Sequence, residues 1–390
     1  MSANRIAVCL GLAIGATLPA AEFAGCVPVR VNRPAGAAEA LKGTPFTCAL
    51  AEVNGAELLV LRPGREARGE RIPVRPREQW NRAATAPVVA ISDGVWPGIR
   101  VTDQAVATPS TEPWIDANTW IVRSARAWSG SRPVWLTHAP PKQAGEQDCL
   151  RALAEVAAAG GYWTPPLEAV ERWPSIAQWA RFFEEHAAWR GFAPAGALGI
   201  VQDSLGKDLA VSGEHLNLIA RRGIPYRVIE RPGLSLASLA GLRVLLASDL
   251  APPTDSERKI LNAFAARGGE VIDGSKGSDP EELSKEMIDL VGYDEVGVRV
   301  YNAPSVMNYL TQADGGRRLL LHLINYATAP AEGVLVRVKG EFSRARLYRP
   351  GGAPVDIGVR RSTGRTEASI PAFPVYAAII WEGVSDERKP

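Results

Sequence analysis

The sequence has almost no excess of charge of either sign. Its 390 residues include 44 Lys or Arg and 42 Asp or Glu, which leaves a formal net charge of +2. A nucleic-acid-binding protein usually has an excess of basic residues, often in long runs, and no long run of one sign is present here. We therefore expect no nucleic-acid partner.

Cysteine and histidine are scarce, with four of each. Cys9, Cys26, Cys48 and Cys149 lie in no CxxC or metal-type spacing, so buried free thiols are predicted, with at most one intramolecular disulfide once Cys9 is removed. The histidines are scattered and form no HExxH motif, so no zinc site is expected. Phosphate-binding glycine loops and the GxSxG nucleophile motif are also absent, and no cofactor is predicted.

Long hydrophobic runs are missing apart from Ile6 to Leu18, which is too short to span a bilayer. Arg5 before this run and Ala20-Ala21 after it indicate a signal peptide over residues 1–21 and a secreted or periplasmic protein. Two alternatives remain: a buried first element, or a lipoprotein cut at Phe23-Ala-Gly-Cys26 and anchored through Cys26. No membrane span is expected.

Apolar residues make up 46% of the chain, enough to build two or three cores. Residues 27–195 alternate short apolar runs with amphipathic stretches, the pattern of β/α repeats. The expected strands are Val27–Val31, Phe46–Leu50, Glu57–Leu61, Pro87–Ser92, Pro133–Thr137 and Gly160–Thr164. The expected helices are a stripe from Trp114 to Trp128 opened by Pro113, Gln147–Ala159 and Ser175–Trp189. The segment is short for an eight-fold barrel, so we predict a reduced or degenerate (β/α) barrel.

Residues 196–294 predict a small doubly wound α/β domain, with a capping box at Thr254 to Glu257 and strands at Ala197–Gln202, Pro225–Ile229, Leu242–Ala247 and Glu270–Ile272. Its end, Ser275–Asp294, is interpreted as a helix or a surface linker. From residue 295 to 383 the period falls to two, which predicts an antiparallel β-sandwich.

The segments Gly199–Asp203, Leu242–Ser248 and Thr254–Gly274, followed by Leu321–Tyr326 and Ala345–Pro350, resemble family-42 β-galactosidases and related clan-A glycoside hydrolases. The resemblance implies a carbohydrate substrate, an amidotransferase-like middle domain that serves in homo-oligomer formation, and a C-terminal β-sandwich. No cysteine follows Cys149, so glutaminase activity is excluded. No Asn-Glu dipeptide of the clan-A type occurs, so no catalytic residue is carried over from the resemblance.

Glycoside hydrolysis needs two carboxyl groups that flank the bond. Four acids near expected strand or helix ends form the candidate pool: Asp93, Glu112, Asp116 and Glu168. Asp93 could instead cap a turn, Glu112 and Asp116 could stabilise a helix start four residues apart, and Glu168 could be a solvated helix residue.

Tryptophan is abundant, with 11 residues of which all but Trp381 lie before residue 190. Trp96, Trp114 and Trp163 lie at expected loops or strand ends, where a flat apolar face can stack on a sugar ring. Among the histidines, His138 is the best placed to bind a sugar hydroxyl, because it follows the expected strand Pro133–Thr137. The alternative is a structural histidine whose hydrogen bonds are satisfied within the protein. The sequence thus predicts a glycoside hydrolase; the alternative is a non-catalytic carbohydrate-binding or scaffold protein derived from one.

Overall fold

The computed structural model describes residues 23, 25–32, 39, 41–62, 70–83, 85–99, 114–206, 209–275 and 279–383. Its first sheet has seven strands in the order β1-β2-β3-β4-β5-β8-β9. These are β1 (Pro28–Val31), β2 (Cys48–Val53), β3 (Glu57–Leu61), β4 (Glu70–Arg75), β5 (Val89–Ile91), β8 (Val134–Leu136) and β9 (Tyr162–Trp163). All six strands expected before residue 165 are present, and β4 is an additional strand.

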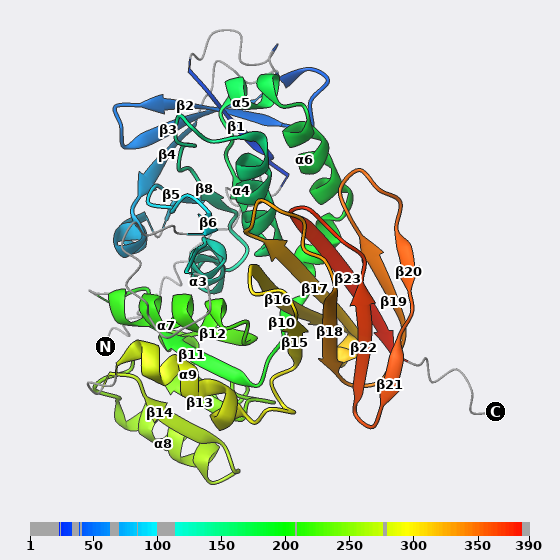
Figure 1. Ribbon diagram of the computed structural model, residues 1–390. Coiled ribbons are helices and arrows are strands. Elements are labelled where there is room, and N and C mark those ends of the chain that lie inside the picture. The colour runs from blue at the N-terminus through cyan, green and yellow to red at the C-terminus, as the bar shows by residue number, and fades with distance from the viewer. Residues whose placement is uncertain are drawn as a thin grey trace, which may run out of the picture.

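The sheet is mixed and nearly closed on itself (Figure 1). Strands β4, β5, β8 and β9 are parallel, β1 and β2 are parallel, and β2, β3 and β4 form an antiparallel meander. A parallel bridge joins Arg30 to Pro166, and the Arg30 N–H donates to Pro165 O at 2.8 Å, so β1 meets the segment after β9. The prediction of a reduced barrel is confirmed as a barrel-like sheet, although part of it is antiparallel.

Helical segments cover the barrel-like sheet. They are η2 (Arg77–Ala83), α3 (Thr119–Ser129), α4 (Glu146–Ala158), α5 (Leu167–Arg172), α6 (Ser175–Glu185) and η3 (Ala187–Gly191). The helix expected from Pro113 begins only at Thr119, because Ile115–Asp116 is a strand, β7, paired with β6 (Gly98–Ile99). Asp116 is therefore not a helix-start acid, and that interpretation was wrong.

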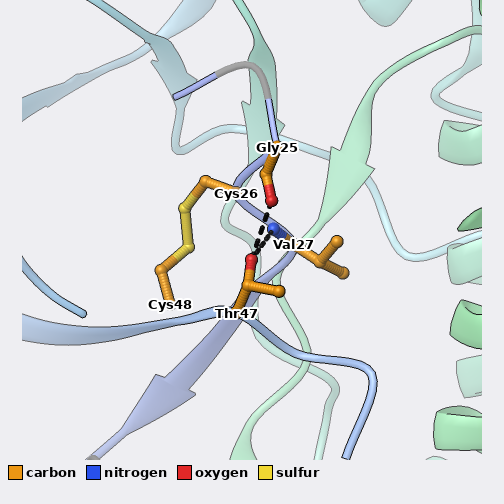
Figure 2. Close-up of a disulfide and its surroundings, with 5 residues drawn as sticks. All are labelled: Gly25, Cys26, Val27, Thr47 and Cys48. Carbon is orange, nitrogen blue, oxygen red and sulfur yellow. Dashed lines mark hydrogen bonds between the residues drawn. A yellow bond between two sulfur atoms is a disulfide. The ribbon is translucent and has the colours of Figure 1, made fainter. Parts of the chain in front are cut away.

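A disulfide joins Cys26 to Cys48, whose Cα atoms are 5.7 Å apart (Figure 2). Beside it, the Thr47 hydroxyl accepts the Val27 N–H and donates to Gly25 O, each at 2.8 Å. The prediction of free thiols was wrong for these two residues and is confirmed for Cys149, which is free and buried. A sulfur bonded to Cys48 cannot carry a lipid thioether, so the Cys26 anchor is also contradicted. The expected signal peptide lies outside the described residues.

The second sheet is four-stranded and parallel, in the order β12-β11-β13-β14. Its strands are β11 (Leu198–Gln202), β12 (Tyr226–Glu230), β13 (Val244–Ala247) and β14 (Glu270–Asp273), and its helices are α7 (Ala210–Arg221), α8 (Asp255–Ala265) and α9 (Pro280–Val291), with a short η4 (Arg231–Gly233). Thr254 and Glu257 form the capping box expected at the start of α8. The segment expected as a helix or linker contains α9.

Two antiparallel sheets make the C-terminal region β-rich (Figure 1). The six-stranded sheet, β10-β16-β17-β23-β19-β20, consists of β10 (Ala193–Pro194), β16 (Val306–Ala313), β17 (Arg318–Asn325), β23 (Tyr376–Gly383), β19 (Phe342–Tyr348) and β20 (Val355–Ile357), with η5 (Asp314–Gly316) before β17. The four-stranded sheet, β15-β18-β22-β21, consists of β15 (Val298–Tyr301), β18 (Val334–Lys339), β22 (Arg365–Ile370) and β21 (Arg360–Ser362). Alternating side chains such as Val334, Val336 and Val338 are buried in their own core.

Among the described residues, every helix is too short or too polar to cross a membrane.

Candidate functional site

The carboxyl edge of the parallel strands β5, β8 and β9 gathers three of the expected site residues. Asp93 follows β5, His138 follows β8, and Glu168 lies in the first turn of α5, just after β9. Loops that follow neighbouring parallel strands meet at one edge of a sheet, which is where barrel enzymes hold their sites. Glu112 lies outside the described residues.

An aromatic cluster of Trp96, His138 and Trp163 lies at this edge. Ring centroids are 5.7 Å apart for Trp96 and His138, 6.1 Å for the two tryptophans, and 6.2 Å for His138 and Trp163. Trp163 is only 1% exposed, and its indole N–H donates to His138 O at 3.2 Å. Trp163 thus supports the cluster from beneath, whereas half-buried Trp96 reaches the surface.

His138 is a buried histidine whose two ring nitrogens have no hydrogen-bond partner among the described residues. Burial, with a smaller contribution from the Arg30 charge, lowers its pKa to about 4. The ring is therefore neutral near pH 7, with one nitrogen able to donate and the other to accept. It lies directly over the backbone after Asp93, since a Cβ on Gly94 would approach Nδ1 to 2.5 Å.

Asp93 is held by the backbone of η2. Its Oδ1 accepts the Arg77 N–H at 2.8 Å, while desolvation raises the pKa of the carboxyl even though the residue is exposed. The Arg77 side chain turns the other way and is buried, with Nη1 donating to Leu209 O at 2.9 Å. Asp93 thus combines solvent access with a carboxyl whose pKa is shifted upward by desolvation, the direction that a general acid requires.

Arg30 of β1 connects β1 to the loop after β8 at the same carboxyl edge. Its Nη1 donates to Thr137 O at 2.9 Å, and Glu52 and Glu168 both act on it electrostatically. The Glu168 carboxylate accepts a hydrogen bond from the Asn32 amide. Arg30 and Glu52 were not expected at the site; the signal that could have indicated them is a charged residue inside each otherwise apolar strand run.

The loop between Asp93 and Trp96 is clamped by Asn118, which the sequence also did not indicate. Its Nδ2 donates to Val95 O at 2.7 Å, and its Oδ1 accepts the Val95 N–H at 2.8 Å. Glu155 of α4, fully buried, accepts hydrogen bonds from the Asn118 side chain and N–H and, at 2.9 Å, from the Tyr326 hydroxyl. This chain of contacts orients the backbone that carries Trp96.

Asp116 and Trp114 lie beside the strand β6 that follows the Trp96 loop, because β7 pairs Asp116 with Gly98. The Trp114 indole N–H donates to Asp116 Oδ1 at 3.2 Å, and the Arg221 guanidinium of α7 stacks 3.4 Å from the Trp114 ring. No ring contact joins Trp114 to the aromatic cluster in the part of the chain that the structure describes. Within the same residues, no group of three His, Cys, Asp or Glu could hold a metal ion.

No protein-family model and no curated protein matches this sequence. Among solved structures, the chain is similar to α-L-fucosidase isoenzyme 2 from Paenibacillus thiaminolyticus, at 11% identity and a TM-score of 0.53, over 68% of this chain and 63% of that one. It is also similar to a GH42 β-galactosidase from G. stearothermophilus (10% identity, TM-score 0.48, 78% of this chain and 61% of that one) and to a β-galactosidase from Rahnella sp. R3 (9%, 0.44, 76% and 61%).

The match to the fucosidase shows that this chain has a glycoside-hydrolase-like fold. The aligned region is less than two thirds of the length of each of these three proteins.

Proposed function

We propose that this protein hydrolyses a glycosidic bond with two carboxyl groups at the carboxyl edge of the barrel-like sheet. The observation that supports the proposal is that Asp93 and Glu168 follow β5 and β9, the two strands that flank β8 in the sheet whose carboxyl edge carries the aromatic cluster of Trp96, His138 and Trp163. One strand separates β5 from β9, so their backbones are about 10 Å apart. Side chains that extend toward each other from backbones at this spacing can reach the carboxyl separation of roughly 5–9.5 Å that glycoside hydrolysis uses.

The proposed roles follow from the surroundings of each acid. Asp93, whose pKa desolvation raises, is assigned as the proton donor to the leaving oxygen. Glu168, beside the Arg30 cation and the Asn32 amide, is assigned as the base or nucleophile. Trp96 offers the sugar a ring face, and neutral His138 offers a hydroxyl partner. Glu112, Asp116, Trp114 and Trp163 remain in the wider set of proposed site residues.

The test is a screen of the purified protein against aryl glycosides and oligosaccharides, followed by Glu168→Gln and Asp93→Asn. Each variant should lower kcat roughly 10²–10⁴-fold while ligand binding stays nearly unchanged, because only proton chemistry is removed. Glu171→Gln on α5 and Asp289→Asn on α9, both exposed, are the matched controls. Full turnover in both acid variants would contradict the assignment.

The second candidate is a non-catalytic carbohydrate-binding or scaffold protein. It is favoured by the absence of any Asn-Glu dipeptide. Saturable binding of an oligosaccharide with no turnover of any glycoside, weakened by Trp96→Ala, would select this candidate.

Three further proposals concern organisation. We propose domains over residues 27–195, 196–294 and 295–383, the middle one amidotransferase-like and serving in homo-oligomer formation. Its all-parallel sheet supports this interpretation. We also propose export by a signal peptide over residues 1–21. The Cys26–Cys48 disulfide supports export, since disulfides persist in oxidising compartments.

A further inference from the structure

A cleft of about 250 Å³ lies where the helices of the barrel-like region, the parallel sheet and the six-stranded C-terminal sheet meet. Its walls come from α3, η3, β12 and β16, and α3 lies against β12 (Figure 1). The residues that carry the argument are Arg123, Arg126, Trp189, Arg190, Tyr309 and Thr311.

The cleft is separate from the candidate active site. Helix α3 begins beside Val95 at the carboxyl edge of β5, and the cleft is lined by residues from the later part of that helix. Gly160, which precedes β9, also lines it. Both observations place the cleft toward the amino edge of the parallel strands, away from Asp93 and His138.

The described lining is positively charged: it contains three arginines and no carboxylate. Arg190 is neutralised by its ion pair with Glu184. Arg123 is fixed, because Nη2 donates to Tyr226 O at 2.6 Å and the guanidinium lies 3.4 Å from the Tyr226 ring centroid. Arg126 donates a single weak hydrogen bond among the described residues, at 3.4 Å to Arg190 O, so most of its donors remain for a ligand.

A hydroxyl group faces the same two charges. Tyr309 packs against Arg123, 4.5 Å from ring centroid to guanidinium carbon, and both Arg123 and Arg126 act electrostatically on its hydroxyl. No hydrogen bond to that hydroxyl exists in the part of the chain that the structure describes. The rings of Tyr309 and Trp189 supply apolar walls beside the charged groups.

We propose that this cleft binds a small ligand that carries one carboxylate on a sugar-sized ring, such as a hexuronic acid. The planar fork of an arginine matches a carboxylate through two parallel hydrogen bonds. The volume is below the roughly 300 Å³ at which pockets for drug-sized ligands begin, which limits the ligand to about one ring. Aromatic walls favour a ring-bearing anion over a bare inorganic one. This inference does not rest on the proposed hydrolysis.

The test is calorimetric titration of the full chain with sodium glucuronate, glucose and inorganic phosphate. Glucuronate should bind saturably, and glucose and phosphate should each bind about tenfold or more weakly. Equal binding of glucose would overturn the role of the charge, and equal binding of phosphate would overturn the role of the ring. No saturable binding of glucuronate would overturn the proposal altogether.

Variants assign the binding to this cleft. Arg126→Gln should weaken glucuronate binding about tenfold or more, and Tyr309→Phe, which keeps the ring and removes only the hydroxyl, should weaken it severalfold. Arg181→Gln, an exposed arginine of α6 outside the cleft, makes the same charge change and should bind as the wild type does. Trp96→Ala, which removes the half-buried ring of the aromatic cluster, should also leave glucuronate binding unchanged. Unaltered binding in both Arg126→Gln and Tyr309→Phe would place the ligand elsewhere, and loss of binding in Trp96→Ala would place it at the barrel edge.

Discussion

Glu155 of α4 is a completely buried carboxyl that the proposed site depends on through Asn118. Its carboxyl is fully buried, and three of the hydrogen bonds it receives come from Asn118 and the Tyr326 hydroxyl. Burial raises its pKa to about 7, against the opposing hydrogen bonds. A buried carboxyl of this kind is neutral in mildly acidic solution. As the pH rises it ionises, and the buried charge destabilises the folded state.

The first prediction at this scale is a pH-dependent stability. A folded-state pKa of about 7 exceeds the unfolded value near 4.5, so the folded chain binds more protons between these values. The contribution of Glu155 to the free energy of unfolding should therefore be highest below pH 4.5 and should fall as the pH rises toward 7. Glu155→Gln should flatten this slope. Urea unfolding at pH 5 and at pH 7.5 measures how much the free energy of unfolding changes between these pH values, with exposed Glu171→Gln as the control. The same change in the wild type and in Glu155→Gln would refute the prediction.

Residue-level prediction from the sequence worked where strand ends determine position. Asp93, His138 and Glu168 lie at one edge because each follows a parallel strand that its apolar run had indicated. Arg30, Glu52, Asn118 and Glu155 could not be found this way, because their roles depend on partners up to 171 residues away in the chain. Trp163 was placed at the correct strand end, but its burial, at 1% exposed, depends on how β8 and β9 pack and could not be predicted.

Elements with local signals were predicted well. Helix α8 follows from the Thr254–Glu257 capping box, and α4 and α6 follow from their apolar stripes. The start of α3 was not predicted, because β7 exists only through pairing with β6. The residues around Ile115 and Asp116 carry no local pattern that reveals a pairing with a strand earlier in the chain. The direction of β2, β3 and β4 is likewise a property of pairing, which periodicity cannot reveal.

The disulfide tests the stability of the first two strands. Cys26 and Cys48 are 22 residues apart, so cross-linking them removes loop-closure entropy from the unfolded chain. Cys48→Ala should lower the free energy of unfolding by about 3 kcal/mol, and 5 mM reductant under denaturing conditions should have the same effect on the wild type. Cys149→Ala serves as a comparison, because its free thiol crosslinks nothing. Thiol counting after denaturation provides a second readout: Cys26 and Cys48 reacting freely without reductant would contradict the bond.

At the scale of the whole molecule, one hydrophobic core extends from Phe23 in the first segment to Ala378 in β23. It includes residues of the barrel-like sheet, of β11 and β13, and of β17. Buried polar groups join the same regions: Arg123 of α3 donates to Tyr226 O of β12, and Arg151 of α4 donates to the backbone at the end of β17 and just after it. Separately folding units would not share a continuous core.

We therefore expect a single cooperative unfolding transition, with calorimetric and van't Hoff enthalpies that agree. Arg151→Met tests the connection, since Arg151 is 2% exposed and donates at 3.1 Å to both Asn325 O and Ala327 O. Removing it leaves two carbonyls without these donors, which should lower the free energy of unfolding by about 2–4 kcal/mol and lower the one transition as a whole. Arg181→Met, on the exposed face of α6, should change it by less than about 0.5 kcal/mol. Two resolved transitions in the wild type, or a variant in which only part of the unfolding signal moves, would show that the C-terminal sheets unfold independently of the barrel-like sheet.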